Sequence, residues 1–125
     1  MRILIILSAL SILLLSETKC GEKSVAEKKY KGKLEIKALC MNYTISVQAG
    51  EMETATIVKN WTDESGKKSY TNVFKLGNPC DFPATINQGD EFYFVIDTSK
   101  GRNCPICMAY YPTPPKALSI KVVDQ

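Results

Sequence analysis

The sequence predicts an all-β fold, a small β-barrel or β-sandwich of six to seven short strands that is cross-linked by two disulfides. Apolar and polar side chains alternate with a period of two residues, which is the pattern of half-buried strands. Clusters of Gly, Pro, Asn and Asp separate these runs at short intervals. Beyond residue 33 the chain carries four cysteines, an even number, and no sustained 3.6-residue period.

The chain has room for one domain. Of its 125 residues, 45% are hydrophobic and 23% are charged, a composition that is ordinary for a globular protein. We expect a single all-β domain at 34–125. It follows a signal peptide at 1–20 and a Lys/Glu-rich tether at 21–33.

The first twenty residues indicate export. One arginine precedes an apolar run, Ile3–Leu15, that only two serines interrupt. A run of about 13 residues fits a secretory signal and is shorter than the roughly 20 residues of a membrane span. Cys20 is either removed with the signal or becomes the lipid-bearing first residue of a lipoprotein, although Glu17-Thr18-Lys19 departs from a lipoprotein signal. The sequence thus predicts an extracytoplasmic protein that is secreted, periplasmic or anchored in the outer membrane, with membrane attachment only through Cys20.

The first predicted strands flank a cysteine. From Leu34 to Cys40 the apolar side chains occupy even positions, and from Tyr43 to Ala49 they occupy odd positions. Such a switch predicts a β-bulge, or one strand that bends from one sheet into another. Cys40 would then lie in the middle of a strand.

Five further strands are expected in the rest of the chain. They cover 54–61, 70–76, 91–97, 106–111 and 118–122, with turn signals at 63–66, 77–79, 87–90 and 99–103. The strand at 106–111 should end at Pro112, because proline lacks the N–H that a ladder requires. In a barrel, the last strand would pair with the first and so remove the exposed edges of the sheet.

Two disulfides are the default for the four cysteines of an exported domain, Cys40, Cys80, Cys104 and Cys107. Residues three apart on a strand face opposite sides, so Cys104 and Cys107 should find different partners. Cys40 and Cys80 would each cross to one of them, and the sequence leaves open which pairs with which.

Two other uses of the cysteines remain open. Cys104-Pro105-Ile106-Cys107 has the C-x-x-C spacing of thiol–disulfide oxidoreductases, but the following segment is strand-like and offers no helix N-terminus to activate a thiol. A four-thiolate zinc site would need Cys40 and Cys80 as ligands, yet these are far apart in sequence rather than paired. Structural disulfides fit the spacing better than either.

Composition excludes several classes of function. The chain contains no histidine, so it holds neither a Ser-His-Asp triad nor a histidine metal ligand. We expect no enzyme activity, no cofactor and no metal. The formal net charge is only +3, and loss of the first twenty residues would lower it further, which argues against nucleic-acid binding.

A few exposed-type residues are candidate surface sites. Trp61, Tyr110 and Tyr111 could form an aromatic binding surface, and a secreted inhibitor could present the loop Tyr110–Pro115 to its target. Packing of Trp61 in the core, and prolines that cap an edge strand, are the more ordinary uses of these residues. Asn42 and Asn60 begin N-glycosylation sequons, which matter only in a eukaryotic secretory pathway.

Several segments together resemble a known group of proteins. The strand region Leu34–Val47 with its cysteine, the turn Gly77–Cys80, the segment Gly89–Phe94 and the segment Cys104–Met108 resemble small exported four-cysteine β-barrel proteins and lipoproteins of Bacteroidetes. The resemblance implies an envelope location and transfers no catalytic residue. We therefore expect a monomeric, non-enzymatic domain with a binding or structural role at the cell envelope or outside the cell, and a protein or glycan as its partner.

Overall fold

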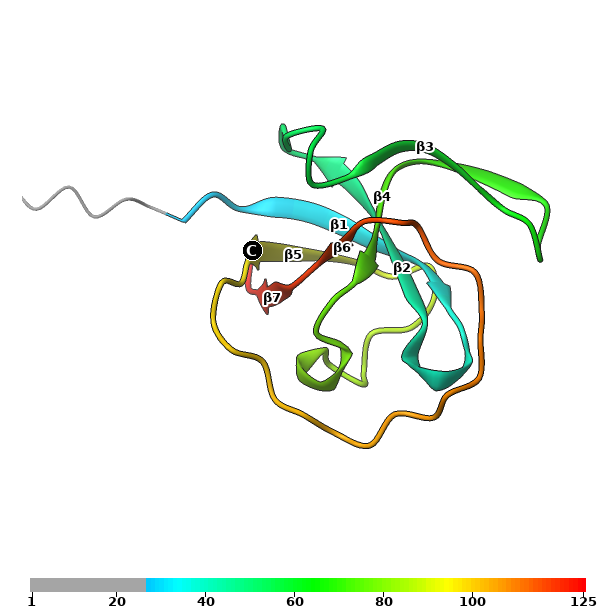
Figure 1. The fold of residues 1–125 in the computed structure, drawn as a ribbon. Helices are drawn as coiled ribbons and strands as arrows, with labels where there is room; N and C mark the ends of the chain where they lie inside the picture. The colour runs from blue at the N-terminus through cyan, green and yellow to red at the C-terminus, as the bar shows by residue number, and fades with distance from the viewer. Residues whose placement is uncertain (1–26) are drawn as a thin grey trace, which may run out of the picture.

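The computed structural model describes residues 27–125 of the chain (Figure 1). The predicted signal peptide at 1–20, the candidate lipidation site Cys20 and the first part of the predicted tether lie outside these residues. Within them, no helix is long and apolar enough to cross a membrane.

Seven strands form one sheet, which confirms the all-β prediction. The strands are β1 (Tyr30–Lys37), β2 (Tyr43–Ala49), β3 (Val58–Asp63), β4 (Lys68–Leu76), β5 (Glu91–Ile96), β6 (Ala117–Leu118) and β7 (Ile120–Val123). Two short 3₁₀ turns, η1 (Leu39–Met41) and η2 (Pro79–Asp81), complete the regular structure of the described residues. The spatial order is β3-β4-β2-β1-β5-β7, with β6 beside β4.

The C-terminal strands bring the two sides of the sheet together. β6 pairs in parallel with β4, and β7 pairs in antiparallel with β5, although β2 and β1 separate β4 from β5 within the sheet. Residues 117–123 therefore connect both sides of a curved sheet, and the architecture is barrel-like without a continuous closed ladder. The expectation that the last strand pairs with the first was wrong, because β5 occupies that edge of β1.

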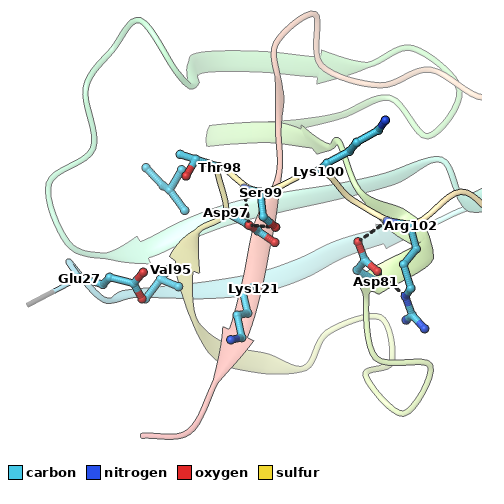
Figure 2. Close-up of a pocket in the computed structure, with 10 residues that line it drawn as sticks. Glu27, Asp81, Val95, Asp97, Thr98, Ser99, Lys100, Arg102 and Lys121 are labelled. Carbon is cyan, nitrogen blue, oxygen red and sulfur yellow. Dashed lines mark hydrogen bonds and ion pairs between the residues drawn. The ribbon is translucent and has the colours of Figure 1, made fainter.

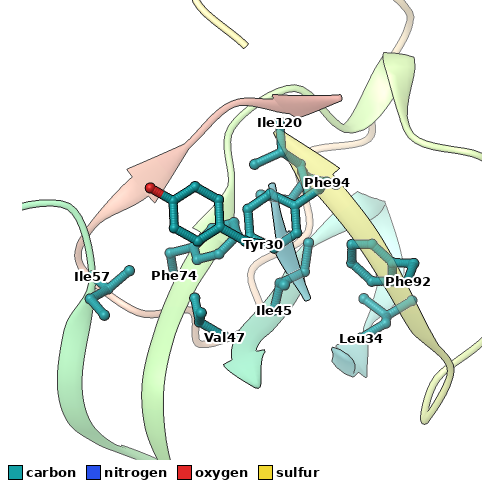
Figure 3. Close-up of a cluster of buried hydrophobic side chains, with 10 residues drawn as sticks. Tyr30, Leu34, Ile45, Val47, Ile57, Phe74, Phe92, Phe94 and Ile120 are labelled. Atoms are coloured by element: carbon teal, nitrogen blue, oxygen red, sulfur yellow. The ribbon is translucent and has the colours of Figure 1, made fainter. Parts of the chain in front are cut away.

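The core fills the inside of this curved sheet. Its buried members are Tyr30, Leu34, Ile45, Val47, Ile57, Phe74, Leu76, Phe92, Phe94 and Ile120 (Figure 3). The rings of β5 and β4 lie at its centre, with centroids 5.9 Å apart for Phe74 and Phe94 and 6.0 Å apart for Phe92 and Phe94.

The predicted tether ends earlier than expected, since β1 begins at Tyr30. Inward side chains alternate along β1 from this tyrosine, which is buried and stacks on Phe94 at 5.5 Å. Gly32 also faces inward, where a Cβ atom would lie 2.9 Å from Cε1 of Phe94. The last four tether residues thus belong to the sheet, and the glycine is required there by the close approach of the ring.

The expected bulge at Cys40 is a tight turn instead. Cys40 and Met41 have φ angles of 55° and 56°, in the left-handed region, and the chain reverses between β1 and β2. The switch in apolar parity therefore separates two antiparallel neighbours, and Cys40 does not lie in mid-strand.

Two of the expected strands differ from the structure. Residues 54–57 form a turn closed by a hydrogen bond from the Thr56 N–H to the Glu53 carbonyl, so that strand begins only at Val58. The strand expected at 106–111 is absent, and residues 100–114 form an unpaired segment that runs around the outside of the sheet (Figure 1, yellow to orange). Disulfides hold this segment where a ladder was expected.

Candidate functional site: an apolar surface on a disulfide-bound loop

Two disulfides attach the long loop between β5 and β6 to the sheet. Cys40 of η1 is bonded to Cys107, and Cys80 of η2 is bonded to Cys104. The prediction that Cys40 and Cys80 each cross to the C-x-x-C segment is confirmed, and the open choice between the two connectivities is resolved. Two disulfides of this kind fit an oxidising, extracytoplasmic compartment.

These bonds bear on the two alternatives for the cysteines. A C-x-x-C oxidoreductase cycles through a bond between its own two cysteines, whereas Cys104 and Cys107 are bonded here to different turns. A zinc site needs free thiolates, and all four cysteine sulfurs of the described domain are used in disulfides.

Side-chain hydrogen bonds hold the loop on either side of the disulfides. The Asn42 amide donates to the carbonyl of Ala109 at 3.1 Å and to the carbonyl of Leu39 at 3.0 Å. The guanidinium of Arg102 pairs with Asp81 of η2, with 2.6 Å between Nε and Oδ1. The loop is therefore fixed at several points along its length.

Tyr111 makes the last of these attachments. Its hydroxyl donates to Oδ2 of Asp63 at 3.0 Å, and Oδ1 of this buried carboxylate accepts the N–H of Ser65 at 2.9 Å. The hydrogen bond to Asp63, with burial and the carboxylate charge, raises the pKa of the Tyr111 hydroxyl.

The large exposed hydrophobic residues gather on this loop and on the turn bonded to it. Among the described residues they are Leu39, Ile106, Met108 and Tyr110, which are 54%, 42%, 96% and 85% exposed. We call these four residues the loop surface. Three of them, Ile106, Met108 and Tyr110, help to line a depression of about 500 Å³, together with both ends of the Cys40–Cys107 bond and the end of β4. Exposed apolar groups gathered in one place are a mark of interaction sites.

The backbone of the exposed loop segment is largely free. In the described chain, no backbone–backbone hydrogen bond involves Pro105–Tyr110, and the Asn42 side chain takes the carbonyl of Ala109. The remaining N–H and C=O groups of this segment are consequently available to a partner.

The residues that the sequence put forward as an aromatic surface lie in different surroundings. Tyr110 belongs to the loop surface, whereas Tyr111 is turned toward Asp63. Trp61 lies on the β3–β4 hairpin and stacks on Tyr70, with ring centroids 6.0 Å apart. Sequence reasoning missed Leu39, Ile106 and Met108, since the alternation at 106, 108 and 110 resembles that of a strand.

The two sequon asparagines also differ in their surroundings. Asn60 is exposed on β3, a strand at the end of the sheet. The side-chain nitrogen of Asn42 makes the two hydrogen bonds that fix the loop, so a glycan on Asn42 would take the hydrogen of one of these bonds.

A second, polar depression of about 540 Å³ lies beside β5 and β7 (Figure 2). Two of its carboxylates are already engaged: Asp81 with Arg102, and Asp97 with the N–H and hydroxyl of Ser99 at 2.8 and 2.6 Å. The hydrogen bonds from Arg102 and Ser99 lower the pKa of Asp81 and of Asp97 respectively. Carboxyl groups that are ionised so firmly are poorly suited to act as general acids at neutral pH.

These lowered pKa values predict that the domain loses stability in acid. Because the pKa of Asp81 is lower in the folded state than in the unfolded chain, its stabilising effect is complete above the unfolded pKa of about 4 and is lost as the pH falls through the folded value. Urea unfolding between pH 6 and pH 2 should therefore show a shallower loss for Asp81→Asn than for the wild type. Identical slopes for both proteins would contradict the assignment, and Asp124→Asn serves as the control.

No protein-family model matches the chain, and no similar curated protein or solved structure was found.

Proposed function

We propose that this chain is an exported, non-enzymatic binding domain whose loop surface docks on a protein partner. The observation that carries the proposal is the gathering of the large exposed hydrophobic residues of the described chain on one disulfide-bound loop and the adjoining turn. Export is supported by the predicted signal peptide and by the oxidising compartment that the two disulfides require.

The shape of the loop surface favours a partner with a pocket. Met108 and Tyr110 contribute to the lining of the depression, yet they are 96% and 85% exposed, so nearly all of each side chain is open to a partner. The partner then supplies the concave side. Burial of apolar and aromatic side chains in such a pocket is the usual source of binding energy at protein interfaces.

Charge also favours a protein with an apolar site. Residues 103–115 include no charged side chain, so nothing in this segment attracts the phosphates of a nucleic acid or of a lipid surface. The disulfides and the Asn42 hydrogen bond order the loop before binding. Association therefore loses less conformational entropy than it would with a flexible loop.

Substitution of Met108 by glutamate is expected to weaken this binding at least about tenfold, because a charge would have to enter an apolar pocket. The exported protein is used to capture partners from the extracytoplasmic fraction of its source, and the Kd of the purified partner is then measured by calorimetry. Thr71→Glu, which adds the same charge at an exposed position on β4, is the control and should bind like the wild type. Unchanged binding of both Met108→Glu and Tyr110→Glu would refute the proposal.

A further inference from the structure

We infer that the partner is an endopeptidase with an apolar primary specificity pocket, and that Pro105–Tyr110 occupies its active-site cleft as a substrate-like inhibitory segment. The inference rests on the proposed function and specifies the class of partner. Three features of the same loop support it: its unpaired backbone, its exposed side chains, and the disulfides and hydrogen bonds that hold it.

The backbone of the segment suits a peptidase cleft. Endopeptidases bind their substrates as an added extended strand, in which main-chain hydrogen bonds give affinity and pockets for side chains give specificity. Pro105–Tyr110 makes no backbone–backbone hydrogen bond within the described domain. Its exposed apolar side chains at 106, 108 and 110 follow the two-residue spacing that such a cleft reads.

Met108 is the side chain best placed to enter the primary pocket. It is the most exposed of the large hydrophobic residues, and fixed points flank it on both sides. Cys107 precedes it and is bonded to Cys40, while the carbonyl of Ala109 follows it and accepts from Asn42. The Met108–Ala109 peptide bond is thus presented on a short segment that is held from both directions.

These attachments separate an inhibitor from an ordinary substrate. A flexible loop adapts to the cleft, is cut and departs, whereas a segment held in one conformation binds with less loss of entropy. If the Met108–Ala109 bond were hydrolysed, Cys107 would hold one new end and the Tyr111–Asp63 hydrogen bond would hold the other. Release of either end from the cleft is therefore disfavoured.

The segment that the structure presents to a partner differs from Tyr110–Pro115, which the sequence suggested. Tyr111 is hydrogen-bonded to Asp63 and Pro114 is buried, so most of that stretch faces its own domain. The outward segment is the preceding one, Pro105–Tyr110.

The test changes the residue at position 108 and asks whether the class of peptidase that is inhibited changes with it. The exported protein with both disulfides intact is incubated with subtilisin and chymotrypsin, which accept apolar residues, and with trypsin, whose primary pocket holds a carboxylate. We expect inhibition of at least one of the first two enzymes and none of trypsin. Met108→Lys should lower the inhibition constant for trypsin at least 100-fold relative to the wild type. Leu39→Lys adds the same charge to the loop surface outside the segment and should not lower it.

Two results of the inhibition assay would overturn the inference. One is rapid cleavage of the loop without inhibition, and the other is the absence of inhibition by both the wild type and Met108→Lys. A captured partner that depends on Met108 but has no peptidase activity would also overturn it, and would leave the proposed function standing. If no binding partner depends on Met108, both the inference and the proposed function are refuted.

Discussion

Replacement of Phe94 by alanine is expected to lower the free energy of unfolding by about 3–5 kcal/mol, the range for removal of a large aromatic ring from a core. Phe94 is fully buried on β5, and the rings of Tyr30, Phe74 and Phe92 surround it at 5.5 to 6.0 Å. It also fills the space that Gly32 leaves open on β1. The cavity would therefore adjoin both β5 and its neighbour β1.

Urea unfolding followed by the fluorescence of Trp61 would measure this loss, since Trp61 is the only tryptophan of the chain. Tyr93→Ala is the matched control: it lies one position earlier on the same strand, on the opposite face, and is not fully buried. We expect the control to lose about 1 kcal/mol. Equal losses in the two variants would show that the inward face of β5 does not dominate the core.

Sequence alone could predict the fold class because the period of two survives wherever one face of a strand is buried. The clearest case is 91–97, where Phe92 and Phe94 are inward, and the structure has β5 at Glu91–Ile96. The same logic missed the start of β1. There the inward positions are Tyr30 and Gly32 among lysines, and a glycine that accommodates an aromatic ring leaves no apolar signal.

The candidate site was harder to predict because alternation reports periodicity and not burial. Ile106, Met108 and Tyr110 have the spacing of a strand, yet no strand of the described chain pairs with them, and their side chains are exposed. Only the disulfide pairing and the Asn42 hydrogen bond place these residues on one surface with Leu39. Both are contacts between residues far apart in sequence, which no local pattern encodes.

The disulfides that create this surface should also supply a large part of the stability of the domain. In the chain-entropy model, a cross-link removes more freedom from the unfolded chain as the loop that it closes grows. The sequence separations are 67 residues for Cys40–Cys107 and 24 for Cys80–Cys104. We expect losses of about 4 kcal/mol for Cys40→Ala/Cys107→Ala and about 3.5 kcal/mol for Cys80→Ala/Cys104→Ala. Small domains have net stabilities of about 5–15 kcal/mol, so either loss is a large fraction.

Unfolding in urea compares the two double variants, and proteolysis separates stability from presentation of the loop. Cys40→Ala/Cys107→Ala frees the residue beside Met108, while Cys80→Ala/Cys104→Ala leaves the Cys107 attachment in place. At equal fractions folded, the first variant should therefore be cut faster within Pro105–Tyr110. Equal cutting in both would mean that the hydrogen bonds of Asn42 and Tyr111 are sufficient to hold the segment. Faster cutting of the first alone would show that the Cys40–Cys107 bond keeps the loop surface in the one conformation that a partner can recognise.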